Sequence, residues 1–260
     1  MGKRSAVDPI AAVRCLVTRD TGFGATDRVL FCANVNSEPK RVLILAAHPD
    51  DEILGCGGVA ALHAARGDHV TSVIACEGQS HRYQGRDIPM TEHSRAAALA
   101  LGVKDVRMLG FPDQQLDTLT LTKIITPIEQ VVREIKPCTV YCQWGGDVNR
   151  DHHLLFEAIL VATRPTESFI ERVLAFDTAS STEWAFPRRF TPDTWIDIGS
   201  VLDQKLAAMK CYESELRDYP HPRSLRALEH KARAWGNQCC MDAAEVFMTV
   251  RRVSRGGRIG

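Results

Sequence analysis

Short apolar runs alternate along this chain with longer segments in which apolar residues recur at the spacing of one helix face. The short runs are rich in β-branched residues and predict strands, whereas the longer segments predict amphipathic helices. The predicted strands cover residues 42–47, 69–76, 106–109, 139–143 and 172–176. The predicted helices cover residues 53–66, 92–101, 121–136 and 152–163. Because strands and helices alternate, we expect a mainly parallel sheet.

Helix-ending residues support these boundaries. Gly67 and Gly102 follow the first two predicted helices, where glycine often ends a helix in the left-handed conformation, and Pro137 follows the third. The C-terminal third continues with a strand at 195–198, helices at 202–212 and 224–235, and a last strand at 244–250. The whole pattern predicts an α/β, Rossmann-like three-layer fold, with a mainly parallel sheet flanked by helices.

The first forty residues lack this pattern. We expect residues 1–40 to form a partly ordered N-terminal extension, in which residues 29–32 could add an edge strand. Residues 41–260 are expected to form a single domain, because a chain of 260 residues is long enough to bury a sizeable core. Repeats, heptads and low-complexity tracts are absent from the sequence, which excludes scaffold architectures.

Composition narrows the class of protein. Lysine and arginine together number 32, and so do aspartate and glutamate, so no net charge attracts nucleic acid or an anionic membrane. The apolar runs fall short of the roughly 20 residues of a membrane helix, and the N-terminus lacks the apolar core of a signal peptide. The nine cysteines are odd in number and most lie in strand-like runs, which is typical of free thiols in a reducing compartment. We therefore expect a cytoplasmic protein with no nucleic-acid partner and no membrane span.

The segment from Ala47 to Glu52 carries the most specific chemical signal in the chain. It follows a predicted strand and places His48 and Asp51 within one tight turn, so an imidazole and a carboxylate can converge on one Zn²⁺ ion while Asp50 stays free. A carboxylate beside a metal-bound water is a natural general base, which is the role we assign to Asp50. The alternative is an acidic first turn of a helix, which accounts for the acids but not for His48.

Other polar residues follow the neighbouring strands. Residues 77–80, Asp113 and residues 145–152 each come after a predicted strand ends. In open parallel sheets, ligands bind at the carboxyl ends of the strands. These loops therefore predict one pocket at this edge of the sheet.

Several motifs resemble those of a known family. The run His-Pro-Asp-Asp-Glu at 48–52 resembles the signature of the PIG-L/LmbE-like zinc deacetylases, and further similar motifs cover 109–113, 145–152, 211–216 and 219–224. The resemblance extends from about residue 41 to about residue 252. It implies zinc-dependent hydrolysis of the N-acetyl amide of an amino sugar or sugar conjugate, which releases acetate and a free amine.

The resemblance also implies a third metal ligand, His152, which occupies the closing histidine of the family's motif at 145–152. With His48 and Asp51 it completes a His-Asp-His set that holds one divalent ion per chain and leaves a position open for water. In the alternative interpretation, Asp151 caps a helix and His152 lies in its first turn. Imidazole and carboxylate ligands accept iron and cobalt as well as zinc, so the sequence does not fix the metal.

The chain departs from the family at Asn149. Relatives carry a histidine three residues before the zinc-binding histidine, thought to stabilise the oxyanion or to protonate the leaving amine, whereas this chain has Asn149. An asparagine can donate a hydrogen bond to an oxyanion but cannot deliver a proton at neutral pH. We assign Asn149 as a catalytic residue, with the acid and base steps both falling on Asp50. A turn asparagine is the alternative.

The polar segment 77–90 lacks apolar periodicity and is expected to cover the substrate. By resemblance, Arg82 in this segment and Asp113 are substrate contacts, although an exposed arginine is more often solvated. The partner is then a small N-acetylated sugar, and the resemblance favours a homo-oligomer. Two other functions stay open. One is an amidase acting on another acyl amide, such as a thiol-sugar conjugate; the other is a non-catalytic sugar-binding protein, which the departure at Asn149 allows.

Overall fold

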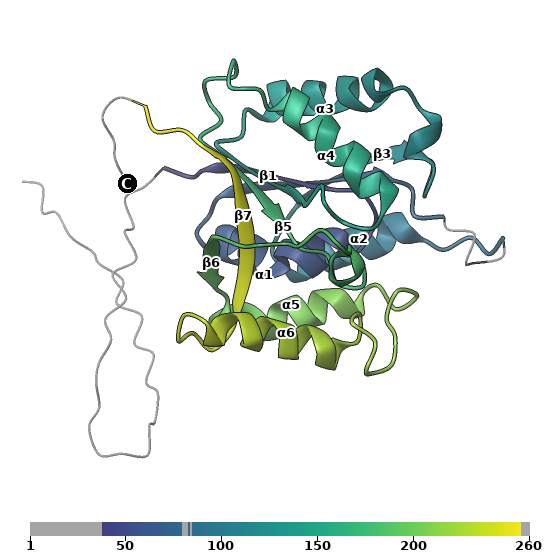
Figure 1. Ribbon diagram of the computed structural model, residues 1–260, viewed down its shortest axis with the longest axis vertical. Helices are drawn as coiled ribbons and strands as arrows, with labels where there is room; N and C mark the ends of the chain where they lie inside the picture. The colour runs from purple at the N-terminus through teal and green to yellow at the C-terminus, as the bar shows by residue number, and fades with distance from the viewer. Residues whose placement is uncertain (1–37, 80–82, 84, 256–260) are drawn as a thin grey trace, which may run out of the picture. The chain divides into compact units, whose positions relative to one another are not determined.

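The computed structural model describes residues 38–79, 83 and 85–255 (Figure 1). Within these residues, seven strands form one sheet in the order β3-β2-β1-β4-β5-β7-β6. The strands are β1 (Arg41–Ala46), β2 (His69–Cys76), β3 (Asp105–Phe111), β4 (Thr139–Gln143), β5 (Arg172–Phe176), β6 (Thr194–Asp197) and β7 (Ala244–Arg252). Neighbouring strands from β3 to β5 run parallel, and β7 runs antiparallel to both β5 and β6. The sheet is therefore mainly parallel, as the sequence predicts.

Helices cover both faces of this sheet (Figure 1). They are α1 (Asp51–Ala65), α2 (Met90–Ala100), α3 (Leu121–Ile135), α4 (Arg150–Ala162), α5 (Leu202–Lys210) and α6 (Leu225–Asn237). α3 and α4 pack on one face, and α1, α2, α5 and α6 lie on the other. Val42 and Ile44 of β1 belong to the core beneath α1, while Leu43 and Leu45 belong to the core beneath α3 and α4. A strand buried on both faces has no polar side, which explains its continuous apolar run. The three-layer prediction is confirmed.

Most predicted boundaries agree with the structure. The predicted strands 69–76, 139–143 and 172–176 coincide with β2, β4 and β5. The predicted helix starts at 53 and 152 are late, because α1 begins at Asp51 and α4 at Arg150. The alternative interpretation, in which Asp151 caps α4, is wrong. Asn149 is the N-cap instead, since its side-chain Oδ1 accepts the Asp151 N–H at 2.9 Å.

Helix α1 is interrupted at Cys56, whose backbone (φ −145°, ψ 25°) is not helical. After the break, the N–H groups of Gly58 and Val59 donate to the two carboxylate oxygens of Glu245 on β7, at 2.8 and 2.7 Å. Lys205 of α5 places its Nζ 2.6 Å from the same carboxylate. Because buried backbone donors need partners, β7 and α5 together stabilise the break. The short first part of α1 is thereby held at the end of β1.

Among the described helices, none is both long and apolar enough to cross a lipid bilayer. The predicted N-terminal extension, with its edge strand at 29–32, lies outside the described residues apart from residues 38–40. The boundary at residue 40 stays a prediction.

Candidate metal centre

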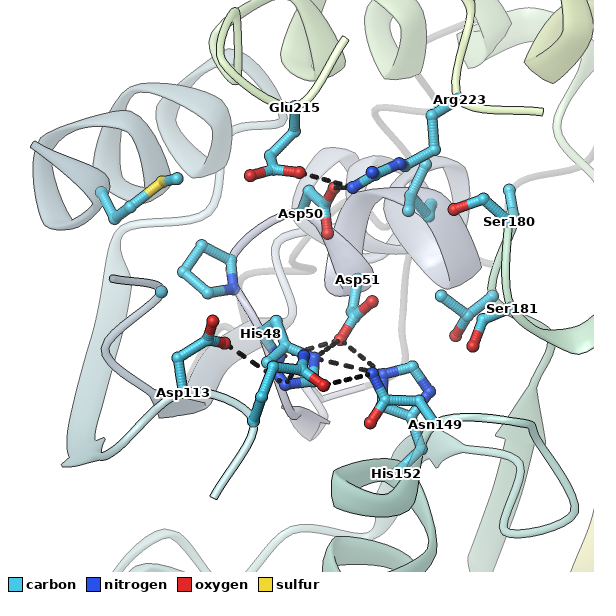
Figure 2. A pocket seen from close by; sticks show the side chains of 17 residues that line it. His48, Asp50, Asp51, Asp113, Asn149, His152, Ser180, Ser181, Glu215 and Arg223 are labelled. Carbon is cyan, nitrogen blue, oxygen red and sulfur yellow. Dashed lines mark hydrogen bonds and ion pairs between the residues drawn. The ribbon is translucent and has the colours of Figure 1, made fainter. Parts of the chain in front are cut away.

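A pocket of about 350 Å³ lies at the carboxyl edge of the sheet (Figure 2). It is lined by segments that follow β1, β2, β3, β4 and β5, together with Glu215 and Arg223 from beyond α5. The loops that the sequence places at this edge therefore meet in one pocket.

His48, Asp51 and His152 converge in this pocket (Figure 2). His48 Nδ1 lies 3.1 Å from Asp51 Oδ2 and 3.2 Å from His152 Nε2, and His152 Nε2 lies 3.3 Å from Asp51 Oδ2. Ligand atoms about 2.0–2.1 Å from a tetrahedral zinc ion lie about 3.3–3.4 Å from one another. The spacing and the chemistry of these donors thus fit one zinc ion.

The chain brings the first two ligands together by a turn at Asp50. Asp50 has a left-handed backbone (φ 101°), which is uncommon for a residue other than glycine. The turn places Asp51 next to His48, whose backbone N–H donates to Asp51 Oδ2 at 2.8 Å. Gln143, the last residue of β4, donates its Nε2 to the same oxygen at 2.6 Å. The Asp51 carboxylate is therefore held by the loop that follows β1 and by the end of β4.

Both imidazoles also have partners on their other ring nitrogen. His152 Nδ1 lies 3.1 Å from Asp147 Oδ2, and His48 Nε2 lies 3.1 Å from Asp151 Oδ2. Ser181 Oγ in turn donates to Asp147. A carboxylate behind a ligating histidine orients the ring and raises its basicity. Asp147 and Asp151 were not predicted as partners of the two histidines. The sequence signal that was available is that both acids lie within five residues of His152.

Charges within the site shift the pKa of its members. Burial alone would raise the pKa of Asp51, but the rings of His152 and His48 outweigh it and hold that pKa below its usual range. Burial alone would lower the pKa of His152, but Asp51 and Asp147 raise it to about 9. An imidazole binds a metal only in its neutral form, so a metal ion here displaces a proton. The carboxylates of Asp51 and Asp147 therefore favour a positive charge at this position, whether it is a proton on His152 or a metal ion.

Asp50 lies in the pocket between Asp51 and Arg223 (Figure 2). Arg223 Nη1 lies 3.3 Å from Asp50 Oδ2 and also bonds to Glu215. Burial, together with the charge of Asp51, raises the pKa of Asp50 well above its usual value, and Arg223 offsets only part of this rise. Arg223 and Glu215 were not predicted as site residues. The available signal was a charged residue inside the proline-containing run 219–223.

Asn149 and Asp113 also line the pocket. Asn149 Oδ1 caps α4 while its Nδ2 donates to Gln114 Oε1 at 3.3 Å, so the turn interpretation holds alongside a place in the pocket. Asp113 is buried, and its Oδ1 lies 3.5 Å from His48 Nε2. Arg82 lies outside the described residues. The roles assigned to Asn149, Asp113 and Arg82 stay predictions.

Comparison with known proteins places this site in context. The family model of GlcNAc-PI de-N-acetylase (PIG-L) matches residues 43–163. YaiS of Escherichia coli K12, an uncharacterized deacetylase, is 31% identical over 198 residues, which cover 72% of this chain and all of YaiS. A probable N-acetyl-alpha-D-glucosaminyl L-malate deacetylase of Bacillus cereus is 30% identical, covering 68% of this chain and 84% of its own. A relative with a different reaction, 4-oxalmesaconate hydratase of Pseudomonas putida, is 30% identical, covering 68% of this chain and 75% of its own.

Solved structures share the fold. The conserved protein TT1542 from Thermus thermophilus superimposes with a TM-score of 0.68 at 25% identity, covering 84% of this chain and 98% of that protein. The α/β architecture is therefore that of a known group of structures. Since YaiS aligns over its whole length at 31% identity and the PIG-L model matches the segment that holds His48, Asp51 and His152, the chain belongs to the PIG-L deacetylase family.

Proposed function

We propose that this protein is a zinc-dependent N-deacetylase, which hydrolyses the N-acetyl amide of an amino sugar or sugar conjugate to acetate and a free amine. The observation that carries the proposal is the convergence of His48 Nδ1, Asp51 Oδ2 and His152 Nε2 beside the carboxylate of Asp50. The Bacillus cereus relative, a probable N-acetyl-alpha-D-glucosaminyl L-malate deacetylase, supports the substrate class.

In this proposal His48, Asp51 and His152 hold the ion. When bound, the ion supplies Lewis-acid polarisation of the amide carbonyl and makes a water molecule more acidic. Asp50 takes the proton of the attacking water, because it is the carboxylate next to Asp51 in the pocket that is not among the three converging ligands. Asp50 then gives that proton to the amine nitrogen as the carbon–nitrogen bond breaks.

Asn149 is assigned to the oxyanion that forms on the carbonyl oxygen. Its Nδ2 carries two N–H groups, of which the contact with Gln114 uses one. A hydrogen-bond donor fixed in place before the reaction stabilises the charge that develops in the transition state. Asn149 can therefore cap α4 and donate to the oxyanion at the same time.

The test is acetate release by zinc-loaded protein from a panel of N-acetylglucosamine, N,N′-diacetylchitobiose and N-acetylglucosaminyl malate. We expect acetate and an equal amount of free amine from at least one of them. The matched variant Asp50→Asn should bind as much zinc and release acetate at least about 100-fold more slowly. Failure of the zinc-loaded wild-type protein to release acetate from every member would contradict the proposal.

A hydratase is the second candidate, because one relative is a hydratase. The same residues can deliver water to an activated carbon–carbon double bond, with Asp50 as the base. Loss of the ultraviolet absorbance of 4-oxalomesaconate, with no acetate from the sugars, would favour this reaction. Release of another acid from acyl amides such as thiol-sugar conjugates would favour a broader amidase. Sugar binding without turnover would indicate a binding protein.

The compartment and the assembly are also proposals. We place the protein in the cytoplasm because of its cysteine pattern, and we propose a homo-oligomer by analogy with the family. Sedimentation analysis of the purified protein measures its oligomeric state.

A further inference from the structure

Arg223 lies between two buried carboxylates in the wall of the pocket (Figure 2). Its Nη1 lies 3.3 Å from Asp50 Oδ2 and also bonds to Glu215 Oε2. The Arg223 side chain is 13% exposed, and those of Asp50 and Glu215 are 5% and 4% exposed. Because little water competes with contacts this buried, a guanidinium here fixes the carboxylates that it touches.

The backbone of Asp50 is fixed, but that alone does not fix its carboxylate. The Asp50 carbonyl accepts the N–H groups of Ile53 and Leu54 at the start of α1, at 3.0 and 2.9 Å. Two side-chain torsions separate this backbone from the carboxylate, and the contact with Arg223 selects among their rotamers. A general base must lie within hydrogen-bond reach of the proton that it takes, and an error of about 1 Å can lower the rate about 100-fold.

Arg223 is itself held on its far side by Glu215. Glu215 lies in the turn after α5, where its N–H donates to the Tyr212 carbonyl at 2.9 Å. Tyr83, which lies between β2 and α2, donates its hydroxyl to Glu215. Tyr83, Glu215, Arg223 and Asp50 therefore form a continuous chain of hydrogen bonds that ends on the assigned base.

We infer that Arg223 is a positioning residue: it orients the Asp50 carboxylate toward the attacking water, and Glu215 anchors Arg223 for this purpose. The inference rests on the proposed function for its kinetic consequence, whereas its structural consequence, the orientation of Asp50, is independent of the substrate. Two other roles of Arg223 would have different effects when the side chain is replaced. An arginine that binds substrate would change KM, and an arginine that only neutralises buried acids would change stability alone.

The kinetic test compares Arg223→Met with Arg226→Met in zinc-loaded protein. Methionine keeps the aliphatic stem, and Arg226 is a matched control because it is an exposed arginine that lies over the Tyr219 ring. We expect Arg223→Met to lower kcat about 100-fold, with KM changed by less than about threefold and zinc binding retained. Arg226→Met should match the wild-type protein. An unchanged kcat, or a higher KM at unchanged kcat, would overturn the inference.

Chemical rescue separates positioning from stability. In Arg223→Ala protein, methylguanidinium can enter the space left by the side chain and donate to both Asp50 and Glu215. We expect it to restore part of the lost kcat in a concentration-dependent manner and to leave the wild-type kcat unchanged. A folded Arg223→Ala protein that methylguanidinium does not reactivate would contradict the inference.

A structural test measures the orientation of Asp50 directly. In crystals of zinc-loaded Arg223→Met protein, we expect a changed Asp50 rotamer and unchanged positions of the three metal ligands. An Asp50 rotamer identical to that of the wild type would overturn the inference. If this variant does not fold, Arg223→Met with Glu215→Gln removes one of the two buried charges that Arg223→Met leaves unpaired, and takes its place in both tests. If the wild-type protein releases no acetate, the proposed function fails, while the crystal comparison still tests Arg223.

Discussion

Asp147 Oδ2 lies 3.1 Å from Nδ1 of His152, while Nε2 of the same ring faces Asp51 at 3.3 Å. The carboxylate thereby selects which ring nitrogen carries the proton and leaves Nε2 free to act as the proposed metal ligand. Asp147 is fixed in turn, since it accepts hydrogen bonds from Thr182 Oγ1 at 3.0 Å and from the Asn149 N–H at 2.9 Å. The proposed metal site therefore depends on a residue outside its three candidate ligands.

Replacing Asp147 with asparagine should weaken zinc binding about 10- to 100-fold, because His152 loses the carboxylate that orients it. Competition with a chromophoric chelator measures the zinc Kd. Asp203→Asn is the control, since Asp203 is exposed on α5 and should leave the Kd unchanged. Equal zinc affinities for Asp147→Asn and wild-type protein would show that Asp147 does not orient the ring.

Two substitutions separate the roles of Asn149. Asn149→Asp keeps a good helix cap but cannot donate a hydrogen bond, so kcat should fall about 100- to 1000-fold with stability nearly unchanged. Asn149→Ala removes both functions and should also lower the free energy of unfolding by about 1 kcal/mol. Steady-state kinetics and urea unfolding measure the two effects. If Asn149→Asp kept full activity, Asn149 would be a cap and nothing more.

The buried ion pair of Lys205 and Glu245, beside the break in α1, predicts how a substitution changes the free energy of unfolding. Glu245→Gln leaves the Lys205 ammonium without a carboxylate, and the two side chains are 4% and 6% exposed. The free energy of unfolding should fall by about 3–5 kcal/mol, as urea titration will measure. Glu229→Gln is the matched control, because its pair with Arg233 is exposed on α6 and contributes about 0–1 kcal/mol. Equal losses for the two variants would contradict this account.

His63 predicts how stability changes with pH. Its Nδ1 lies 2.6 Å from Asp68 Oδ2 and its Nε2 lies 3.1 Å from Tyr141 Oη. Burial lowers the pKa of His63 below its usual value of 6.5, and Asp68 offsets only part of the shift. The folded state thus favours the neutral ring, so this contribution to stability is present above pH 6.5 and is lost as the pH falls from 6.5 through the lower pKa of the folded state.

The measurement is the free energy of unfolding from about pH 8 to about pH 5 for wild-type and His63→Gln protein. The stability advantage of the wild type should shrink as the pH falls. His69→Gln, at an exposed position at the start of β2, should show no such change. A wild-type advantage that is constant or grows toward low pH would show that the ring is not held neutral.

The sequence predicts the centre of the fold better than its edges. β2, β4 and β5 were located to the residue because each is a short run rich in apolar and β-branched residues, as expected for strands that are largely buried. The helix starts at Asp51 and Arg150 were missed because the first turns of α1 and α4 are polar and do not follow the apolar spacing. The strand at β7 was predicted, but its position between β5 and β6 depends on packing between distant segments.

Site residues that are close in sequence were likewise easier to predict than those that packing brings together. His48 and Asp51 could be paired from the sequence because one turn of chain joins them. Arg223 could not, because it meets Asp50 across 173 positions and only the packed C-terminal segments bring the two together. Family resemblance supplied His152, and it also marked the segment 219–224, but it did not indicate that Arg223 within that segment contacts Asp50.

The partner of the break in α1 has a consequence for how the protein matures. Glu245 lies 187 positions after Gly58, so the amide groups at the break meet their acceptor only after almost the whole chain has left the ribosome. Pairings between such remote segments form late in folding. The loop that carries His48 and Asp51 is thus made early but acquires its rigid support last, and the capacity to hold a metal firmly should emerge only when the C-terminal strand has docked.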